Sequence, residues 1–122
     1  MMAVMTAMIL AAAFQPAEDW QEVTRTDRGT LSADIASKSR AGDIVTLRTR
    51  TQLAEALPDG TASIVARMRY NCRRNQSETM AVTMIGADCA EILASEIPDD
   101  QRQMEPVVPD SPDALLAAFA CR

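Results

Sequence analysis

Few residues in this chain have side chains that could carry out catalysis. Histidine is absent from the 122 residues, which removes the commonest general base and the commonest metal ligand. The three cysteines show no CxxC spacing, and the glycine patterns of phosphate, dinucleotide and nucleophile-elbow sites are missing. We therefore expect no metal site and no cofactor.

Adjacent acidic residues are the remaining catalytic option, because two carboxyl groups can act as a general acid and a general base. Glu18 with Asp19, and Asp99 with Asp100, are such pairs. Both lie in segments that we expect to be a boundary or a loop, where solvated acids are ordinary. We predict that the protein is not an enzyme, and a carboxylate-based hydrolase is the least favoured alternative.

Five arginines offer a different chemistry, the binding of anions. Arg48 and Arg50 alternate with apolar residues on one predicted strand, and Arg67, Arg69 and Arg73 do so on another. A planar guanidinium can bind a carboxylate or sulfate group through two parallel hydrogen bonds. If the two strands are neighbours, these side chains form one face that could bind an acidic polymer or a protein partner. The alternative is a solvated face whose charges are met by nearby Asp and Glu.

The overall charge limits the class of partner. The chain has 12 basic and 17 acidic residues, a formal net charge of -5, which argues against nucleic acid and anionic membranes as bulk electrostatic partners. A length of 122 residues with 48% apolar residues indicates one domain with one core. Nothing in the sequence indicates an oligomeric state.

The elements that must position the arginines are organised around residues 63–73, where apolar and polar residues alternate with the period of a half-buried strand. One face is predicted to be core and the other wet and basic, with Val65 as the exception. The core face carries Ile64, Ala66, Met68, Tyr70 and Cys72, and the wet face carries Arg67, Arg69, Asn71 and Arg73. This strand is expected to lie centrally in the sheet.

The rest of the chain predicts further strands and one helix. Ser111 can cap a helix that has Pro112 at its first position and Asp113 in its first turn. We predict an α+β fold: a single antiparallel sheet of about five to six strands with this C-terminal helix packed on one face. The other strands are expected at residues 20–26, 30–35, 44–50, 79–85 and 91–97, with turns at 27–29 and 74–77, a polar loop at 37–42, one helical turn at 52–56 and a surface connection at 98–109. On the strand at 79–85, Met80, Val82 and Met84 should point inward.

The N-terminal segment differs from everything that follows it. Residues 1–17 contain no Asp, Glu, Lys or Arg and resemble the apolar region of a signal peptide, with cleavage expected near Ala13 or Ala17. The alternative is a buried N-terminal helix. The segment is too short for a membrane span of ~20 residues, and no cysteine near it allows a lipid-modified N-terminus. We expect a periplasmic or secreted domain over residues 18–122, without membrane insertion.

Three cysteines in an exported chain imply one disulfide and one free thiol. If the strands at 63–73 and 79–85 form a hairpin, Cys72 lies near its turn and Cys89 near its far end, about 30 Å away, whereas a bridge needs Cα atoms within ~7 Å. We therefore predict a Cys72–Cys121 disulfide and a free Cys89. The alternative is three reduced thiols in a cytosolic protein.

The order of landmarks then points to a known family. Trp20, Gly29, Asp34 with Ser37, the run 42–45, the run Tyr70 to Arg73, and a terminal helix ending in Cys121 resemble the surface-adhesin protein E-like domain family. The resemblance covers residues 19–122. It implies an antiparallel sheet with a C-terminal helix packed across it, in an exported protein of Gram-negative bacteria. For the namesake it implies attachment to proteins of the host extracellular matrix.

These observations predict a small exported binding module that contacts an acidic polymer or protein partner, at the bacterial envelope or outside the cell. The alternative is a structural protein of the envelope that has no soluble ligand. Both differ from the hydrolase, because neither needs a catalytic residue.

Overall fold

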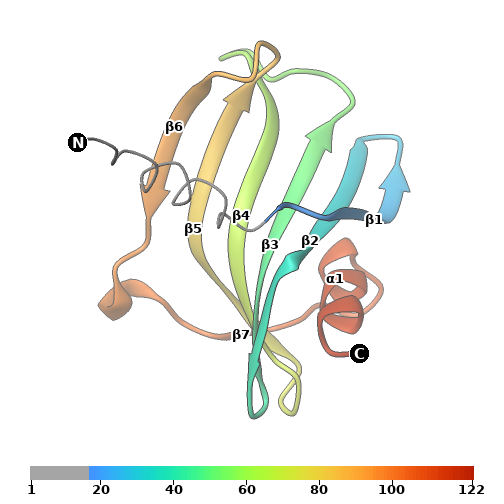
Figure 1. Cartoon of the computed structure of the whole chain (residues 1–122), viewed down its shortest axis with the longest axis vertical. Coiled ribbons are helices and arrows are strands. Elements are labelled where there is room, and N and C mark those ends of the chain that lie inside the picture. The colour runs from blue at the N-terminus through green and yellow to red at the C-terminus, as the bar shows by residue number, and fades with distance from the viewer. Residues whose placement is uncertain (1–16) are drawn as a thin grey trace, which may run out of the picture.

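The computed structural model describes residues 17–122, which form one twisted antiparallel sheet and a C-terminal helix (Figure 1). The strand order is β1-β2-β3-β4-β5-β6, and the short β7 pairs with β5 beside β6. Apart from Ala17, the predicted signal segment lies outside the described residues. The elements are β1 (Trp20–Thr26), β2 (Gly29–Ala41), β3 (Ile44–Leu53), β4 (Thr61–Asn71), β5 (Gln76–Gly86), β6 (Glu91–Glu96), the 3-10 helix η2 (Asp99–Gln101), β7 (Glu105–Pro106) and α1 (Pro112–Ala120).

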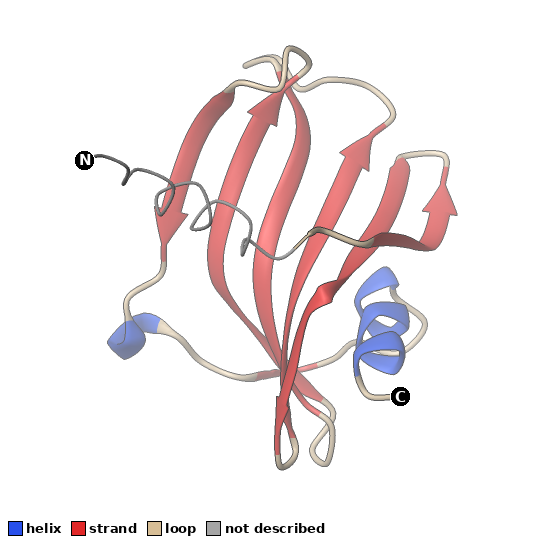
Figure 2. Ribbon diagram, in the orientation of Figure 1, coloured by secondary structure: helices blue, strands red, loops and turns tan. Residues whose placement is uncertain are grey.

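The predicted fold class is confirmed, and the strand at the centre of the prediction is a central strand. β4 lies between β3 and β5 and pairs with both over most of its length. Figure 2 shows the strands spread apart at one end of the sheet and brought together at the other, where the β2–β3 and β4–β5 turns lie. A hydrogen bond of 2.8 Å from the Cys72 amide to the Asp43 carbonyl joins these two turns.

The core lies between one face of the sheet and α1. Alternate residues in the first half of β3 are buried on this face: Val45 and Leu47 completely, and Thr49 almost completely. The helix begins as predicted, because Ser111 Oγ accepts a hydrogen bond of 3.1 Å from the Ala114 amide and Pro112 follows it. A helix of nine residues is too short to be stable alone, so it depends on this packing. The buried apolar residues are Ala33, Val45, Leu47, Tyr70, Val107, Leu116, Ala117 and Ala120.

The polar loop predicted at residues 37–42 is wrong, because β2 continues to Ala41. The pairing with β3 shifts between Asp34 and Ser39, which is a bulge in β2. Side chains satisfy the backbone there. Asp34 Oδ1 accepts hydrogen bonds from the amides of Asp19 (2.8 Å) and Ala36 (3.1 Å), and Ser37 Oγ accepts one of 2.9 Å from the Arg48 amide. Ser37, the first residue of the predicted loop, therefore joins β2 to β3.

Other differences from the prediction have similar causes. The helical turn expected at 52–56 does not form, because Gln52 pairs with both Thr30 and Ser63 in the sheet. β5 begins earlier than predicted, at Gln76, because the hairpin turn is tighter. Val82 and Met84 share the face of Ala66 and Ile64 as expected, but a register shift places Thr79, not Met80, opposite Met68.

Candidate functional site

The register of β3 and β4 brings four of the predicted arginines onto one face of the sheet. Arg48 stands directly opposite Arg67, and the next positions place Arg50 opposite Val65 and Thr46 opposite Arg69. Residues that pair across antiparallel strands point to the same side. Val45 and Leu47, which alternate with these residues, face the helix. We call the set Arg48, Arg50, Arg67 and Arg69 the arginine face; it lies on the side of the sheet away from α1.

The fifth predicted residue, Arg73, lies past the end of β4. The strand ends at Asn71, whose Oδ1 accepts hydrogen bonds from the amides of Arg73 (3.1 Å) and Arg74 (3.0 Å) and so turns the backbone. Arg73 is exposed in this turn. Because the strand has ended, the alternation that placed Arg67 and Arg69 does not place Arg73.

Acidic residues meet three of the four guanidinium groups. Arg48 lies 3.5 Å from the Asp34 carboxylate and 3.8 Å from that of Glu18. Arg67 lies 3.3 Å from Glu96, and Arg69 lies 3.1 Å from Glu78. Arg50 has no carboxylate within 4.0 Å among residues 17–122. The face therefore contains both positive and negative charges. For three of its arginines this agrees with the alternative prediction, a face whose charges are met by nearby Asp and Glu.

Burial separates these acids into two kinds. The side chains of Asp34 and Glu78 are 3% and 9% exposed, so their arginines neutralise charges that are held in the protein. The side chains of Glu18 and Glu96 are 55% and 72% exposed. Ion pairs as exposed as these contribute about 0–1 kcal/mol, and solvent or another anion can replace them.

Trp20, which was not among the predicted site residues, completes the site. The guanidinium carbons of Arg48 and Arg50 lie 5.3 and 4.5 Å from the centroid of its ring, within the range of cation–π attraction. It reaches this position because β1 pairs with β2, which sets Trp20 opposite Asp34, itself opposite Arg48. The sequence offered one indication of this role: Trp20 is the only tryptophan, and it lies on a predicted strand.

One row of paired residues crosses the whole sheet through this site. A groove of about 220 Å³ lies along its β3–β6 part. Arg48, Arg67 and Glu96 contribute charged groups to the groove, and Val65 contributes apolar surface. The row runs Trp20, Asp34, Arg48, Arg67, Ala81, Glu96.

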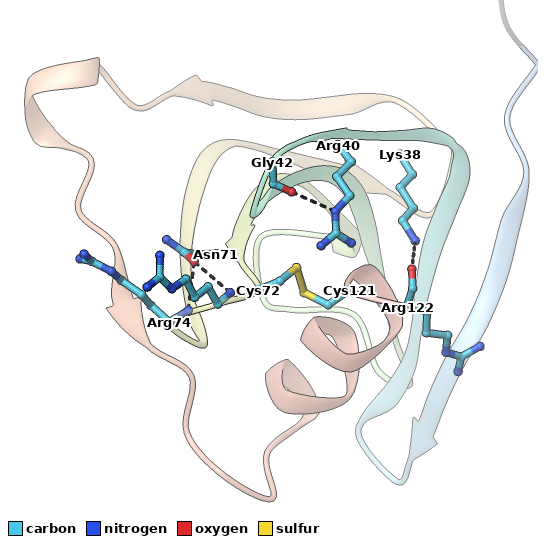
Figure 3. The surroundings of a disulfide bond; sticks show 9 residues. Lys38, Arg40, Gly42, Asn71, Cys72, Arg74, Cys121 and Arg122 are labelled. Atoms are coloured by element: carbon cyan, nitrogen blue, oxygen red, sulfur yellow. Dashed lines mark hydrogen bonds between the residues drawn. A yellow bond between two sulfur atoms is a disulfide. The ribbon is translucent and has the colours of Figure 1, made fainter.

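The cysteines form the predicted disulfide and leave the predicted free thiol. The structure joins Cys72 to Cys121, with Cα atoms 5.7 Å apart, and so ties the end of β4 to the end of α1 (Figure 3). Cys89 is free and exposed in the turn between β5 and β6. Within residues 17–122, no three Cys, Asp or Glu side chains are grouped to hold a metal ion. The helices of this part of the chain are all too short or too polar to cross a membrane.

The two acidic pairs considered for catalysis, Glu18 with Asp19 and Asp99 with Asp100, lie at different elements and bind different partners. Glu18 accepts a hydrogen bond from the Trp20 indole, and the Asp19 amide binds Asp34. Asp99 pairs with Arg102 in the exposed turn of η2. The two pairs thus have separate partners at separate elements.

Comparison with known proteins identifies a family and several similar structures. The family model of surface-adhesin protein E matches residues 20–122. A crystal structure of Haemophilus influenzae protein E, in crystal form II, is similar with a TM-score of 0.62 and 15% identity, covering 88% of this chain and 94% of that one. Protein E from non-typeable Haemophilus influenzae has a TM-score of 0.58 and 14% identity, with coverage of 88% and 81%. No curated protein matches the sequence.

Proposed function

Because the chain belongs to the surface-adhesin protein E family, we propose that it is an exported, non-enzymatic binding module that contacts an acidic patch on a protein partner through the arginine face. The family supports export or a surface location, and the binding of a host or extracellular partner. The choice of face and the acidic chemistry of the partner rest on the geometry of β3 and β4.

The observation that carries the proposal is the register that sets Arg48 opposite Arg67. Two like charges directly opposite each other on neighbouring strands destabilise a sheet unless other groups compensate them. The compensation of this pair is incomplete, because Arg67 meets only the exposed Glu96. The neighbouring Arg50 has no carboxylate within 4.0 Å in the described chain. A carboxylate of a partner can therefore bind Arg50 and Arg67 without exposing a buried charge.

The composition of the face supports a protein partner. Trp and Arg are the residue types most enriched where protein interfaces gain their binding energy. Trp20 is half-buried, carries Arg50 on its ring and lies at the end of a row that includes Arg67. An aromatic surface with guanidinium groups beside it can bind apolar and acidic side chains of one segment together.

The test is calorimetric titration with a poly-glutamate peptide as the acidic probe. In the variant Arg50→Gln with Arg67→Gln, we expect at least a tenfold loss of affinity, because both removed charges are those without a buried carboxylate partner. The parent's affinity should also fall with salt, since exposed charges are screened beyond ~8 Å at physiological ionic strength.

The matched control is Arg25→Gln with Arg28→Gln. It removes the same number of charges from exposed positions of the β1–β2 hairpin; Arg25 lies on the same side of the sheet but is paired with Glu22, and neither residue is one of the four of the arginine face. Binding by this control should equal that of the parent. Equal losses in both variants would mean that only net charge matters, which would contradict the proposal.

Export is the second half of the proposal. What supports it is the sequence of residues 1–17, which contain no Asp, Glu, Lys or Arg and resemble the apolar region of a signal peptide with cleavage near Ala13 or Ala17. We expect protein recovered from the periplasm or the medium to begin between Phe14 and Glu18. Mass spectrometry of the N-terminus measures this directly, and cytosolic protein that keeps Met1 would contradict it.

A further inference from the structure

Figure 3 shows Lys38, Arg40, Arg74 and Arg122 around the disulfide, and Arg73 follows Cys72 in the chain. We call the surface of these five residues the disulfide end. Arg40, Arg73, Arg74 and Arg122 are exposed there, and Lys38 is half-buried. The five come from β2, from the β4–β5 turn and from the residue that follows Cys121.

Specific contacts bring these three segments together. The disulfide holds Cys72 and Cys121 with Cα atoms 5.7 Å apart, which places the turn with Arg73 beside the end of the helix. Lys38 Nζ donates a hydrogen bond of 3.4 Å to the Arg122 main-chain oxygen, which joins β2 to the same segment. The Cys72 amide binds the Asp43 carbonyl across the two hairpins. The cluster is thus fixed by the fold and by a covalent bond.

The four arginines of this end have no carboxylate partner within the described chain, whereas Lys38 is bound to the main-chain oxygen of Arg122. Across residues 17–122, none of the five cations lies within 4.0 Å of an Asp or Glu carboxylate. The guanidinium groups that have a partner use neutral groups: Arg40 donates to the Gly42 carbonyl (3.0 Å), and Arg122 lies over the Phe119 ring (4.9 Å). Asp43 lies at this end, and Arg74 shares a groove with Glu78 and Asp99, but none of these three carboxylates lies within 4.0 Å of the five cations. The arginine face differs, since acids meet three of its four cations.

We propose that the disulfide end binds a sulfated polysaccharide. Four of the five cations are arginines, whose weakly hydrated, planar guanidinium suits sulfate. A bilayer would need an apolar anchor, but the exposed large apolar residues of the described chain, Leu57, Ile92, Leu93, Val108 and Leu115, all lie in other segments. The charges are spread over three segments around the disulfide, which fits repeated anionic groups on an extended chain. This surface is separate from the arginine face of the proposed function.

The net charge of -5 makes this inference specific. A polyanion is repelled by the protein as a whole, so binding requires a local basic surface. The probe is dextran sulfate, and uncharged dextran controls for the sugar backbone. We expect the parent to bind dextran sulfate and not dextran, with affinity that decreases as salt is added.

The variant Arg73→Gln with Arg74→Gln removes two exposed cations of this end. The hydrogen bonds at these positions use the backbone amides, so the turn should keep its structure. We expect at least a tenfold loss of affinity for dextran sulfate, while the control Arg25→Gln with Arg28→Gln stays within twofold of the parent. Equal thermal unfolding of the variants shows that the loss does not come from misfolding.

Several results would overturn the inference. It fails if the parent does not bind dextran sulfate, if the Arg73 and Arg74 variant binds as well as the parent, or if anionic phospholipid vesicles or poly-glutamate bind this end more tightly than dextran sulfate does. If dextran sulfate binding is lost in the Arg50 and Arg67 variant and kept in the Arg73 and Arg74 variant, the inference is wrong while the proposed function stands.

Discussion

The guanidinium of Arg48 lies 3.5 Å from the carboxylate of Asp34, which is opposite it on the neighbouring strand and almost completely buried. Asp34 also accepts hydrogen bonds from the amides of Asp19 and Ala36. One carboxylate therefore fixes the start of β1, the bulge of β2 and the first arginine of the arginine face. The site is built on this buried charge, and its removal should be costly.

We predict that Asp34→Asn destabilises the protein by about 2 kcal/mol, because it removes a buried charge that Arg48 and two amides compensate. Chemical unfolding measures the change. Asp100→Asn is the control, since Asp100 is exposed and should change stability by less than ~0.5 kcal/mol. A loss in Asp34→Asn as small as that of the control would show that the network does not hold the bulge.

Arg67 and Arg69 should respond differently to charge reversal, although they are two positions apart on one face. Arg69 compensates Glu78, whose side chain is 9% exposed, and Arg69→Glu would leave two acids there. Arg67 meets the exposed Glu96 and stands opposite Arg48. A glutamate at position 67 would be attracted by Arg48, which offsets its repulsion from Glu96. We expect Arg69→Glu to cost about 2–3 kcal/mol and Arg67→Glu less than ~1 kcal/mol. Thermal unfolding of the two single variants decides, and equal costs would contradict this account of the pairs.

The sequence predicted the strands of this face well, because alternation along β3 and β4 is strict. Arg48, Arg50, Arg67 and Arg69 all lie on the side that it indicated. It could not place Arg73, because the end of a strand depends on local hydrogen bonds, here those of the Asn71 side chain. Alternation also carries no information on the partners of a side chain. The contacts of Arg48 with Asp34 and Trp20 depend on which strands are neighbours.

The prediction failed mainly where polar side chains replace regular pairing. Ser37 and the polar residues after it made residues 37–42 resemble a loop, since such residues often bind local backbone groups in turns. In the structure Asp34 and Ser37 satisfy the amides of a bulge, and the strand continues. Only the neighbouring strand, which contributes the Arg48 amide, distinguishes the two cases.

The disulfide should contribute strongly to stability. Cys72 and Cys121 are 49 residues apart, and the loop-entropy model assigns about 4 kcal/mol to closing a loop of this length. We expect Cys72→Ser with Cys121→Ser to lower the free energy of unfolding by about 4 kcal/mol, and Cys89→Ser to leave it unchanged. Peptide mapping without reductant checks the pairing, and a peptide that links Cys72 to Cys89 would refute it.

Tyr70 gives a prediction at alkaline pH. Burial raises the pKa of its phenol above the ordinary value of 10.0, and the Asp113 carboxylate adds to this effect. The folded state keeps the neutral phenol, so its stabilisation is complete below the unfolded-state pKa near 10 and is lost as pH rises above it. The melting temperature of the parent should therefore fall more steeply above pH ~10 than that of Tyr70→Phe.

Near pH 7, Tyr70→Phe should be as stable as the parent or up to about 1 kcal/mol more stable, because the buried hydroxyl has no hydrogen-bond partner in the described residues. Tyr70 is the only tyrosine, so ultraviolet absorbance follows its ionisation directly. Ionisation near pH 10 without unfolding would contradict the burial of this phenol.

Trp20 provides the most direct measurement of the central proposal, that an acidic partner binds the arginine face. It is the only tryptophan, and Arg48 and Arg50 lie over its ring. Titration with poly-glutamate should therefore produce a saturable change in Trp20 fluorescence, with the same affinity that calorimetry gives. The change should be lost in the Arg50→Gln, Arg67→Gln variant and kept in the Arg25→Gln, Arg28→Gln control. Calorimetric binding that leaves Trp20 fluorescence unchanged would place the partner elsewhere and contradict the proposal.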